Sequence, residues 1–348
     1  MSILRVLHEL GMETQLWRAP DGSTALLLPH GGRILSLCSL ASEENFFWTH
    51  PALQSVDTAR AFYAGPWWHN SGGDRTWLAP EFEFFLPDYP QPEPYFQPRQ
   101  LDPGNYELQD APHEGSMVNR LSLRMYASDR MLHAKIQKTI TPAANPLLAT
   151  AAHSASELEY AGYTLRTTLT LEEPSTGSLP PVGLWNLLQL PHGGEMIFAT
   201  YSRAVAVPYM GSISRNDLRF FDHTVRYRMR APGELKFGIP AAYVTGRGAY
   251  LHGNANRSSL IIRNFTVNPS ASYVDVPLAN PQMPGCAAQA CNINSSLGSF
   301  SELEYHTPAV GGPSGQSLSI DESQLWAFRG PQPAVLEAAR LLVSAELS

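Results

Sequence analysis

The chain has 348 residues, 43% of them hydrophobic, which is enough for a large core, and a formal net charge of −7. This acidic balance disfavours nucleic acid or an anionic membrane surface as the main partner. No stretch approaches the roughly 18 apolar residues of a membrane span, and the first residues lack the apolar core and cleavage site of a secretory signal, so we expect a cytoplasmic protein without a membrane partner.

The first part of the chain alternates short apolar segments with turns. Residues 3–10 fit either a short helix or an edge strand, and residues 24–28 and 34–37 fit two strands joined by a turn. Residues 41–66 are expected to be irregular. The prolines between 86 and 104 would interrupt a strand ladder, so this segment is expected to be a loop whose aromatic residues either line a cleft or pin the loop.

From about residue 117 onward, apolar and polar residues alternate with the period of two that is typical of β-strands. Strands are predicted at 118–125, 132–136, 165–171, 260–265 and 273–276. The segments 225–229 and 235–239 flank a Pro-Gly turn and predict a hairpin.

Only the end of the chain has helical periodicity, with Pro333 at the predicted helix start. No linker rich in Pro, Gly or Ser separates domains, and no short-period repeat is present. The chain is therefore predicted to form a single all-β domain over residues 1–348. A large antiparallel β-sandwich would occupy about 15–330, with a short C-terminal helix at about 334–346. The three cysteines give no disulfide framework.

The segment 67–81 concentrates aromatic, titratable and hydrogen-bonding side chains around a double-glycine turn. Such a mixture suits a polyhydroxylated ligand, because an apolar sugar face stacks on a ring while its hydroxyls meet the polar groups. The same residue types also fit a buried turn in which Arg75 pairs with a nearby carboxylate and the tryptophans fill the core. The members of this group are Trp67, Trp68, His69, Asn70, Asp74, Arg75, Trp77 and Glu81.

A second group lies near the end of the chain, in the segment 300–308. As a strand, this segment places Glu302, Glu304 and His306 on one face and the apolar residues between them on the other. Crowded carboxylates raise one another's pKa, which can produce a proton donor or acceptor poised near pH 7. A solvated strand edge is the alternative interpretation.

Trp185, in the apolar segment 182–194, either stacks on a ligand or fills the core. The signatures of phosphate-binding loops, dinucleotide-binding loops, zinc proteases and serine hydrolases are missing. No pair of histidines has the spacing of a metal site on a helix. We therefore expect neither a cofactor nor a bound metal, and the oligomeric state stays open.

The chain resembles a family of uncharacterised bacterial proteins whose signature is Gly-Gly-His-Arg-x-Trp-x-Ala-Pro-Glu. The matching stretches are Gly31-Gly32-Arg33-Ile34, after an early strand, and Gly72-Gly73-Asp74-Arg75-Thr76-Trp77-Leu78-Ala79-Pro80-Glu81. That family is similar to the galactose mutarotase-like group, which has a β-supersandwich fold and includes aldose 1-epimerases. The late segment Leu303-Glu304-Tyr305-His306 resembles the mutarotases' Leu-Glu-Thr-Gln, whose Glu is the general base.

The resemblance implies that a sugar ring is opened and reclosed by paired proton transfers, with Glu304 as the general base and Arg75 binding sugar hydroxyls. Two positions depart from the pattern. Asp74 replaces the family's usual His, and Val182 stands where mutarotases carry the His that acts as the general acid. The proton would then have to come from elsewhere, with His69 or His306 as candidates.

The leading hypothesis is a carbohydrate-active protein that binds a sugar or oligosaccharide on the concave face of the sandwich and, if it is an enzyme, acts as an aldose 1-epimerase-like isomerase. The alternatives are a non-catalytic carbohydrate-binding protein and a polysaccharide lyase or glycoside hydrolase on the same scaffold. The hypothesis requires Arg75 and Glu304 to face the same hollow. The predicted catalytic residues are Glu304, His306 and His69, and the predicted substrate-binding residues are Arg75, Asp74, Glu81, Trp77, Asn70, Trp185 and Glu302.

Overall fold

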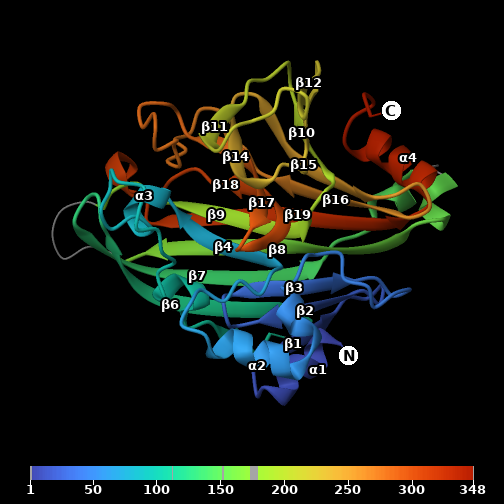
Figure 1. Cartoon of the computed structure of the whole chain (residues 1–348), viewed down its shortest axis with the longest axis horizontal. Helices are drawn as coiled ribbons and strands as arrows, with labels where there is room; N and C mark the ends of the chain where they lie inside the picture. The colour runs from blue at the N-terminus through green and yellow to red at the C-terminus, as the bar shows by residue number, and fades with distance from the viewer. Residues whose placement is uncertain (1, 112, 151–152, 173–178, 348) are drawn as a thin grey trace.

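Most of the regular structure is antiparallel sheet, arranged in two large sheets with short helices at their edges (Figure 1). The computed structural model describes residues 2–111, 113–150, 153–172 and 179–347. The predicted all-β antiparallel sandwich with a short C-terminal helix is confirmed. Among the described residues, none of the helices is long and apolar enough to cross a membrane.

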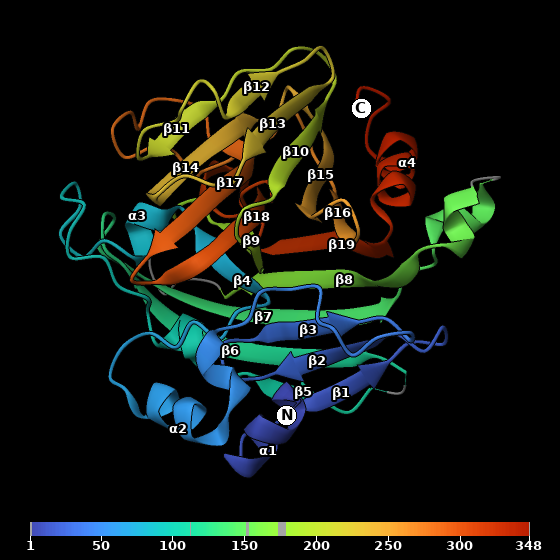
Figure 2. The same cartoon turned by 45° about the vertical axis from the view of Figure 1, so that its right-hand side comes forward.

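The first sheet has nine strands in the order β1-β2-β3-β4-β9-β18-β17-β14-β11. In Figure 2 its N-terminal strands lie at the bottom and its yellow and orange strands at the top, with β4, β9 and β18 between them. The strands are β1 (Gln15–Arg18), β2 (Thr24–Leu28), β3 (Arg33–Cys38), β4 (Asp74–Ala79), β9 (Gly183–Pro191), β18 (Gly298–His306), β17 (Cys286–Ser295), β14 (Gly233–Pro240) and β11 (Val207–Met210).

The second sheet has ten strands in the order β12-β13-β10-β15-β16-β19-β8-β7-β6-β5. It contains the longest strands of the chain, whose apolar residues alternate with polar ones as the sequence predicts. The strands are β12 (Leu218–Phe220), β13 (Thr224–Arg228), β10 (Glu195–Thr200), β15 (Val244–Gly253), β16 (Ser258–Phe265), β19 (Leu318–Gly330), β8 (Glu159–Leu171), β7 (Arg130–Pro142), β6 (Gly115–Met125) and β5 (Glu107–Gln109).

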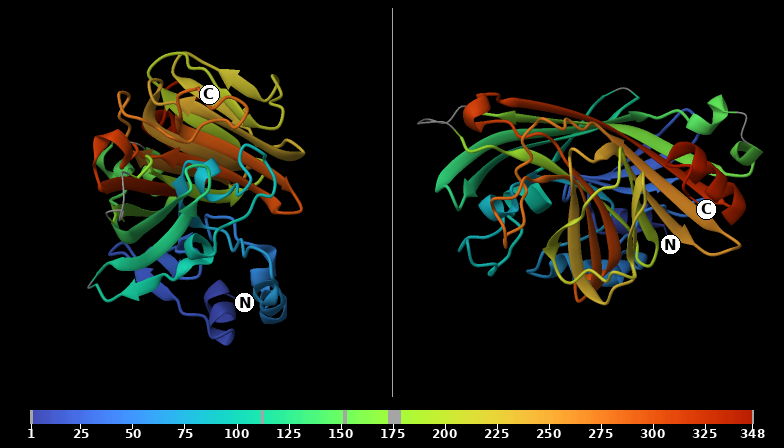
Figure 3. Two further views of the ribbon diagram at one scale, coloured as in Figure 1. Left: turned by 90° about the vertical axis from the view of Figure 1, so that its left-hand side faces the viewer. Right: turned by 90° about the horizontal axis from the view of Figure 1, so that it is seen from above.

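The helices cover faces of the sheets that the other sheet leaves open. In α1 and α2, buried residues such as Val6 and Phe62 form one apolar cluster with the outward side chains of β2 and β3. Helix α4 packs Val335 and Ala339 on Leu260 and Phe328 of the ten-stranded sheet. Figure 3 shows α4 beside this sheet and α1 and α2 at the opposite end of the molecule. The helical segments are α1 (Ile3–Glu9), α2 (Val56–Ala64), α3 (Glu81–Phe84) and α4 (Gln332–Leu342), with single turns η1 (Pro51–Gln54), η2 (Gln100–Gly104), η3 (Pro146–Ala149), η4 (His153–Ser156) and η5 (Gly312–Ser314).

Three predictions about elements are wrong. The two strands of the predicted hairpin, β13 and β14, lie in different sheets, because β13 pairs with β10 and β12 whereas β14 pairs with β17 and β11. Residues 273–276 form no strand and belong to the connection between β16 and β17. Residues 41–66 are not irregular throughout, since they contain η1 and α2. The alternation of apolar and polar residues identifies a strand, but it does not determine which strands lie next to it in a sheet.

Candidate functional site

Five adjacent strands of the nine-stranded sheet, β4, β9, β18, β17 and β14, carry the candidate site on one face. Arg75 and Glu304 both lie opposite Leu187 of β9, and opposed residues in an antiparallel sheet point to the same side. We call this side, which is turned away from the ten-stranded sheet, the outer face. Its side chains include Arg75, Trp77, Trp185, Gln189, Lys236, Gln289, Cys291, Glu302, Glu304 and His306.

Arg75 is held by a carboxylate from the far end of the sequence. Its Nη2 donates to Glu302 Oε1 at 2.8 Å, and Gln189 Nε2 donates to the same oxygen at 3.0 Å. The guanidinium carbon lies 4.3 Å from the centre of the Trp77 ring and 5.3 Å from that of Trp68. The arginine is therefore fixed between a carboxylate and two indole rings, and these contacts stabilise its positive charge although the side chain is buried. Its partner is Glu302, and not a carboxylate of its own segment.

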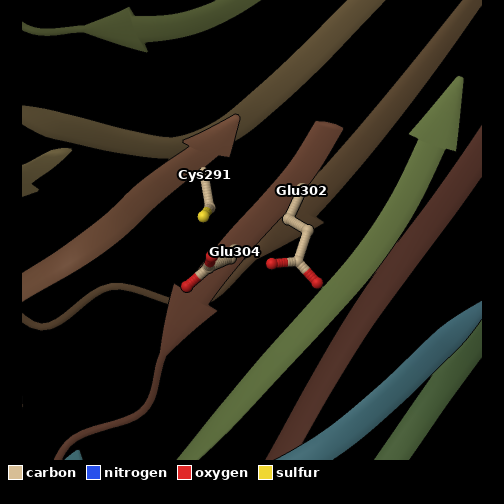
Figure 4. A group of neighbouring side chains, drawn as sticks. All are labelled: Cys291, Glu302 and Glu304. Atoms are coloured by element: carbon tan, nitrogen blue, oxygen red, sulfur yellow. The ribbon is translucent and has the colours of Figure 1, made fainter. Parts of the chain in front are cut away.

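Glu304 lies beside Glu302 and Cys291 at the centre of the outer face (Figure 4). Trp185 Nε1 donates to Glu304 Oε2 at 2.7 Å, and Lys236 Nζ lies 3.4 Å from the same oxygen. Burial is the largest effect on this group and raises its pKa to about 7, partly offset by Lys236. Near neutral pH the carboxyl group can therefore both accept and release a proton.

His306 ends the strand and stacks on Trp185, with ring centres 5.7 Å apart. Burial lowers the pKa of His306 to about 4, so its imidazole is neutral at pH 7. Asp275, in the connection between β16 and β17, places Oδ2 at 3.7 Å from His306 Nε2 and accepts from Gln289 Nε2 at 2.7 Å. Burial alone would raise the pKa of Asp275, but Lys236 and other neighbours lower it. Asp275 thus stays ionised next to a neutral imidazole.

Lys236 projects from β14 into this group of carboxylates. Its Nζ lies 4.1 Å from the centre of the Trp185 ring and 5.6 Å from that of Tyr209. Burial alone would lower the pKa of Lys236, but Glu304, Glu81 and Asp275 together raise it above its usual value. The ammonium group is therefore charged at every physiological pH.

The outer face is closed over this site. Glu304 has 0% of its surface exposed and Arg75 has 2%, so the expectation of an open hollow is wrong, although both residues do share one face. The cover is α3 with the loop that follows it, which lie beside the ends of β14 and β17 in Figure 2. The Tyr95 ring, 37% exposed, stacks on Phe85 at 5.6 Å, and Phe85 meets the edge of Trp185 at 5.9 Å.

One hydrogen bond fastens the outermost layer of this cover. Tyr95 Oη donates to Glu81 Oε1 at 2.8 Å, and the backbone N–H of Glu81 donates to Asp275 Oδ1 at 3.2 Å. Glu81, predicted to bind substrate, thus joins the covering loop to the carboxylates below it. Glu304 therefore has no open route to solvent in this closed arrangement.

Some of the buried polar atoms that lack a hydrogen-bond partner belong to this site, while others are spread over the rest of the described structure. Buried polar groups in proteins are nearly always hydrogen-bonded, so each exception calls for a partner such as a ligand or water. Within the described part of the chain, several donor atoms and several acceptor atoms on or beside this face lack a hydrogen-bond partner. The atoms are Arg75 Nε and Nη1, Asn70 Nδ2 and Oδ1, Gln189 Oε1, Gln289 Oε1, Glu304 Oε1, and His306 Nδ1 and Nε2.

Two of the predicted site residues lie away from this group. Asp74 precedes Arg75 on β4 and therefore points to the opposite face, where it pairs with Arg263 and accepts from Tyr163 Oη between the two sheets. Nδ1 of His69 lies 3.2 Å from Nε2 of His30, and Nε2 of His69 lies 3.0 Å from the Gly65 carbonyl oxygen. Asp74 is thus a structural residue of the inter-sheet core.

The remaining predicted residues stay on the outer face or beside it. Trp77 stands edge-on to Trp185 at 5.4 Å, and its Nε1 donates to Asp102 Oδ2 at 3.2 Å. Asn70 is buried in the segment that leads into β4. The double glycine before β4 is required there, because a Cβ on Gly73, which has φ +77°, would lie 2.4 Å from a carbonyl oxygen of β3.

Sequence reasoning missed Lys236, Asp275, Gln289 and Cys291. Lys236 lies in an apolar strand, Leu-Lys-Phe-Gly-Ile, where a lone lysine at an alternate position was the available signal. Asp275 lies in an irregular connection, so no periodicity could relate it to the other residues.

The cluster of Cys291, Glu302 and Glu304 also has the dimensions of a metal site, since one ligand atom of each lies within 4.8 Å of the others. Its charges are already balanced by Arg75 and Lys236. Burial raises the pKa of the Cys291 thiol well above its usual value, which disfavours the thiolate that binds metals. The group is better described as a paired set of carboxylates than as a metal centre.

No protein-family model and no curated protein sequence matches the chain. Solved structures with a similar arrangement include a candidate aldose 1-epimerase from Escherichia coli K12, with 11% identity and a TM-score of 0.48 over 92% of this chain and 99% of that one. A candidate aldose 1-epimerase from Klebsiella pneumoniae has 10% identity and a TM-score of 0.47 over 94% and 83%. An aldose epimerase homologue from C. elegans has 10% identity and a TM-score of 0.42 over 92% and 99%. The names of these three proteins fall in the aldose 1-epimerase group, which the sequence motifs also resemble.

Proposed function

We propose that the protein binds one pyranose sugar on the outer face, between Arg75 and Glu304, and exchanges the two anomers of that sugar. The observation that carries this proposal is the set of buried polar atoms without partners, placed among tryptophan rings and around Glu304. A sugar hydroxyl both donates and accepts, so one ring can satisfy unpaired donors and acceptors together. The motif resemblance to mutarotases points the same way.

The chemistry follows from the two oxygens of Glu304. Oε2 is engaged by Trp185 Nε1 and lies near Lys236, whereas Oε1 has no partner in the described part of the protein. Oε1 is therefore the atom that would take the proton of an anomeric hydroxyl. The pKa of about 7 suits a group that removes this proton and later returns it. Arg75 Nη1 would donate to another hydroxyl of the same ring.

Entry of the sugar requires the cover to open. The stack of Tyr95 on Phe85 and the bond from Tyr95 to Glu81 are the contacts to be broken. A closed cover then excludes water from the carboxylates, which strengthens their interactions with the bound sugar.

A second candidate function is sugar binding without catalysis. Val182, at the position where mutarotases carry the acid His, is fully buried and pairs its backbone with Val310, so it supplies no proton. A protein of this kind would keep the sugar-binding groups and lose the reaction.

Proton NMR of freshly dissolved α-glucose and α-galactose tests the proposal. Accelerated exchange of the anomers by the wild-type protein, lost in Glu304→Gln, is the expected result. Saturable binding without exchange would replace it with the second candidate. Release of reducing ends from a polysaccharide would instead indicate a hydrolase or lyase, and neither binding nor exchange at high sugar concentration would refute both candidates.

A further inference from the structure

Glu304 forms an ion pair with Lys236, which comes from β14, two strands away. The lysine lies opposite Cys291 in the sheet, and its Nζ is 3.4 Å from Glu304 Oε2. It is buried and lies over the ring of Trp185 at 4.1 Å. The ammonium group is thus held against the carboxyl group whose other oxygen, Oε1, has no hydrogen-bond partner in the described part of the protein.

Exchange of anomers needs an acid as well as a base. When the anomeric hydroxyl loses its proton, the bond between the anomeric carbon and the ring oxygen breaks, and its electron pair moves to the ring oxygen. That oxygen must then receive a proton. His306 is neutral at pH 7, so it offers only a weakly acidic N–H, whereas Lys236 carries a positive charge. The carboxylates around Lys236 raise its pKa and weaken it as an acid, but uptake of the anomeric proton by Glu304 removes the nearest of these negative charges and makes the ammonium a stronger acid at that moment.

We propose that Lys236 is the proton donor to the sugar ring oxygen, a role that rests on the proposed function. Glu304 Oε1 takes the anomeric proton, the anomeric carbon becomes a carbonyl, and Lys236 Nζ gives one proton to the ring oxygen. Rotation about the bond next to the carbonyl exposes its other face. The ring hydroxyl then attacks, returns its proton to Lys236, and Glu304 returns the first proton to the anomeric oxygen, so nothing is consumed.

The neighbours of Lys236 keep the donor charged between turnovers. Its ammonium group is surrounded by three carboxylates, a thiol and two aromatic rings, which hold both its charge and its position. These neighbours are Glu304 on β18, Glu81 on α3, Asp275 in the connection before β17, Cys291 on β17, Trp185 on β9 and Tyr209 on β11.

Two variants separate this role from simple charge balance. Lys236→Arg keeps the positive charge but does not release a proton, because the guanidinium stays protonated in proteins. We expect it to bind sugar like the wild type, to unfold at a similar temperature, and to lose about 100-fold or more of the exchange rate, the usual contribution of a general acid. Wild-type exchange by Lys236→Arg would overturn the role.

Lys236→Met tests the same point through pH. Loss of the ammonium group raises the pKa of Glu304 further, so a lysine that only tuned this carboxylate would leave a variant whose exchange rate recovers as pH rises. If Lys236 is the proton donor, the exchange rate of Lys236→Met stays low from pH 6 to 9. Recovery would overturn the role while leaving the proposed function standing, whereas a wild-type protein that binds no sugar and exchanges no anomers would overturn the function itself.

Discussion

Replacing Glu304 with glutamine should remove a loss of stability that the wild-type protein suffers as pH rises, although it also removes the proposed base. Glutamine has the same shape and offers an oxygen that still accepts from Trp185 Nε1. It differs in carrying no charge and no titratable proton. It also leaves the buried Lys236 without this partner, which lowers the stability of the variant at every pH at which the lysine is charged. The pH dependence of the difference between variant and wild type therefore reports the free-energy cost of ionising one buried carboxyl group.

The magnitude follows from the pKa of Glu304, which rises from its usual 4.5 to about 7 in the folded protein. Below pH 4.5 the folded and unfolded chains both hold this proton, so it does not affect stability. Between pH 4.5 and 7 only the folded chain holds it, and the free energy of unfolding falls as pH rises. At about 1.4 kcal/mol for each pH unit, the loss reaches about 3 kcal/mol. Glu304→Gln avoids this loss.

Urea unfolding monitored by tryptophan fluorescence at pH 5, 6, 7 and 8 measures the effect. We expect the variant to gain stability relative to the wild type as pH rises, most of the change occurring below pH 7. Glu43→Gln, an exposed carboxylate of a loop, is the matched control for the loss of a glutamate. A difference between Glu304→Gln and wild type that does not change with pH, or that changes in the opposite direction, would refute the reasoning.

Three further substitutions test other parts of the structure. Arg75→Met leaves the buried carboxylate of Glu302 without its cation and should cost about 3–5 kcal/mol in urea unfolding; the double variant with Glu302→Gln should recover most of it, and no recovery would contradict the pairing. Gly73→Ala places a methyl group against the neighbouring backbone and should lower the melting temperature more than Gly193→Ala, which has a similar φ but open space; equal losses would argue against the steric cause. Tyr95→Phe removes one hydrogen bond of the cover, at about 1 kcal/mol, and should speed hydrogen exchange in the covering loop, while unchanged exchange would show that this bond does not hold the loop.

The fold could largely be predicted from the sequence because it depends on alternation. Segments such as 132–136 and 165–171 become strands, and the last helix forms where the spacing changes to 3.6. The main wrong prediction concerns which strands pair with each other. The Pro-Gly turn before β14 looks like a hairpin turn, but the chain crosses there from one sheet to the other, where β13 lies between β12 and β10 and β14 lies between β17 and β11. Local residues do not encode that choice.

The candidate site shows the same limit. Alternation in β18 correctly placed Glu302, Glu304 and His306 on one face, and Arg75, next to the turn before β4, shares that face. The same alternation would have sent Asp74 to the other face, had the segment been treated as a strand. The closed cover and the contribution of Lys236 depend on loops and on sheet order, which no single segment of the sequence contains.

The most direct test is a crystal structure of the Glu304→Gln variant grown with a high concentration of galactose or glucose. We predict one pyranose ring beneath the displaced Tyr95 loop, with a hydroxyl on Arg75 Nη1 and the anomeric oxygen at the side chain of residue 304. A sugar bound elsewhere on the molecule, with the outer face still closed over Arg75, would contradict the account.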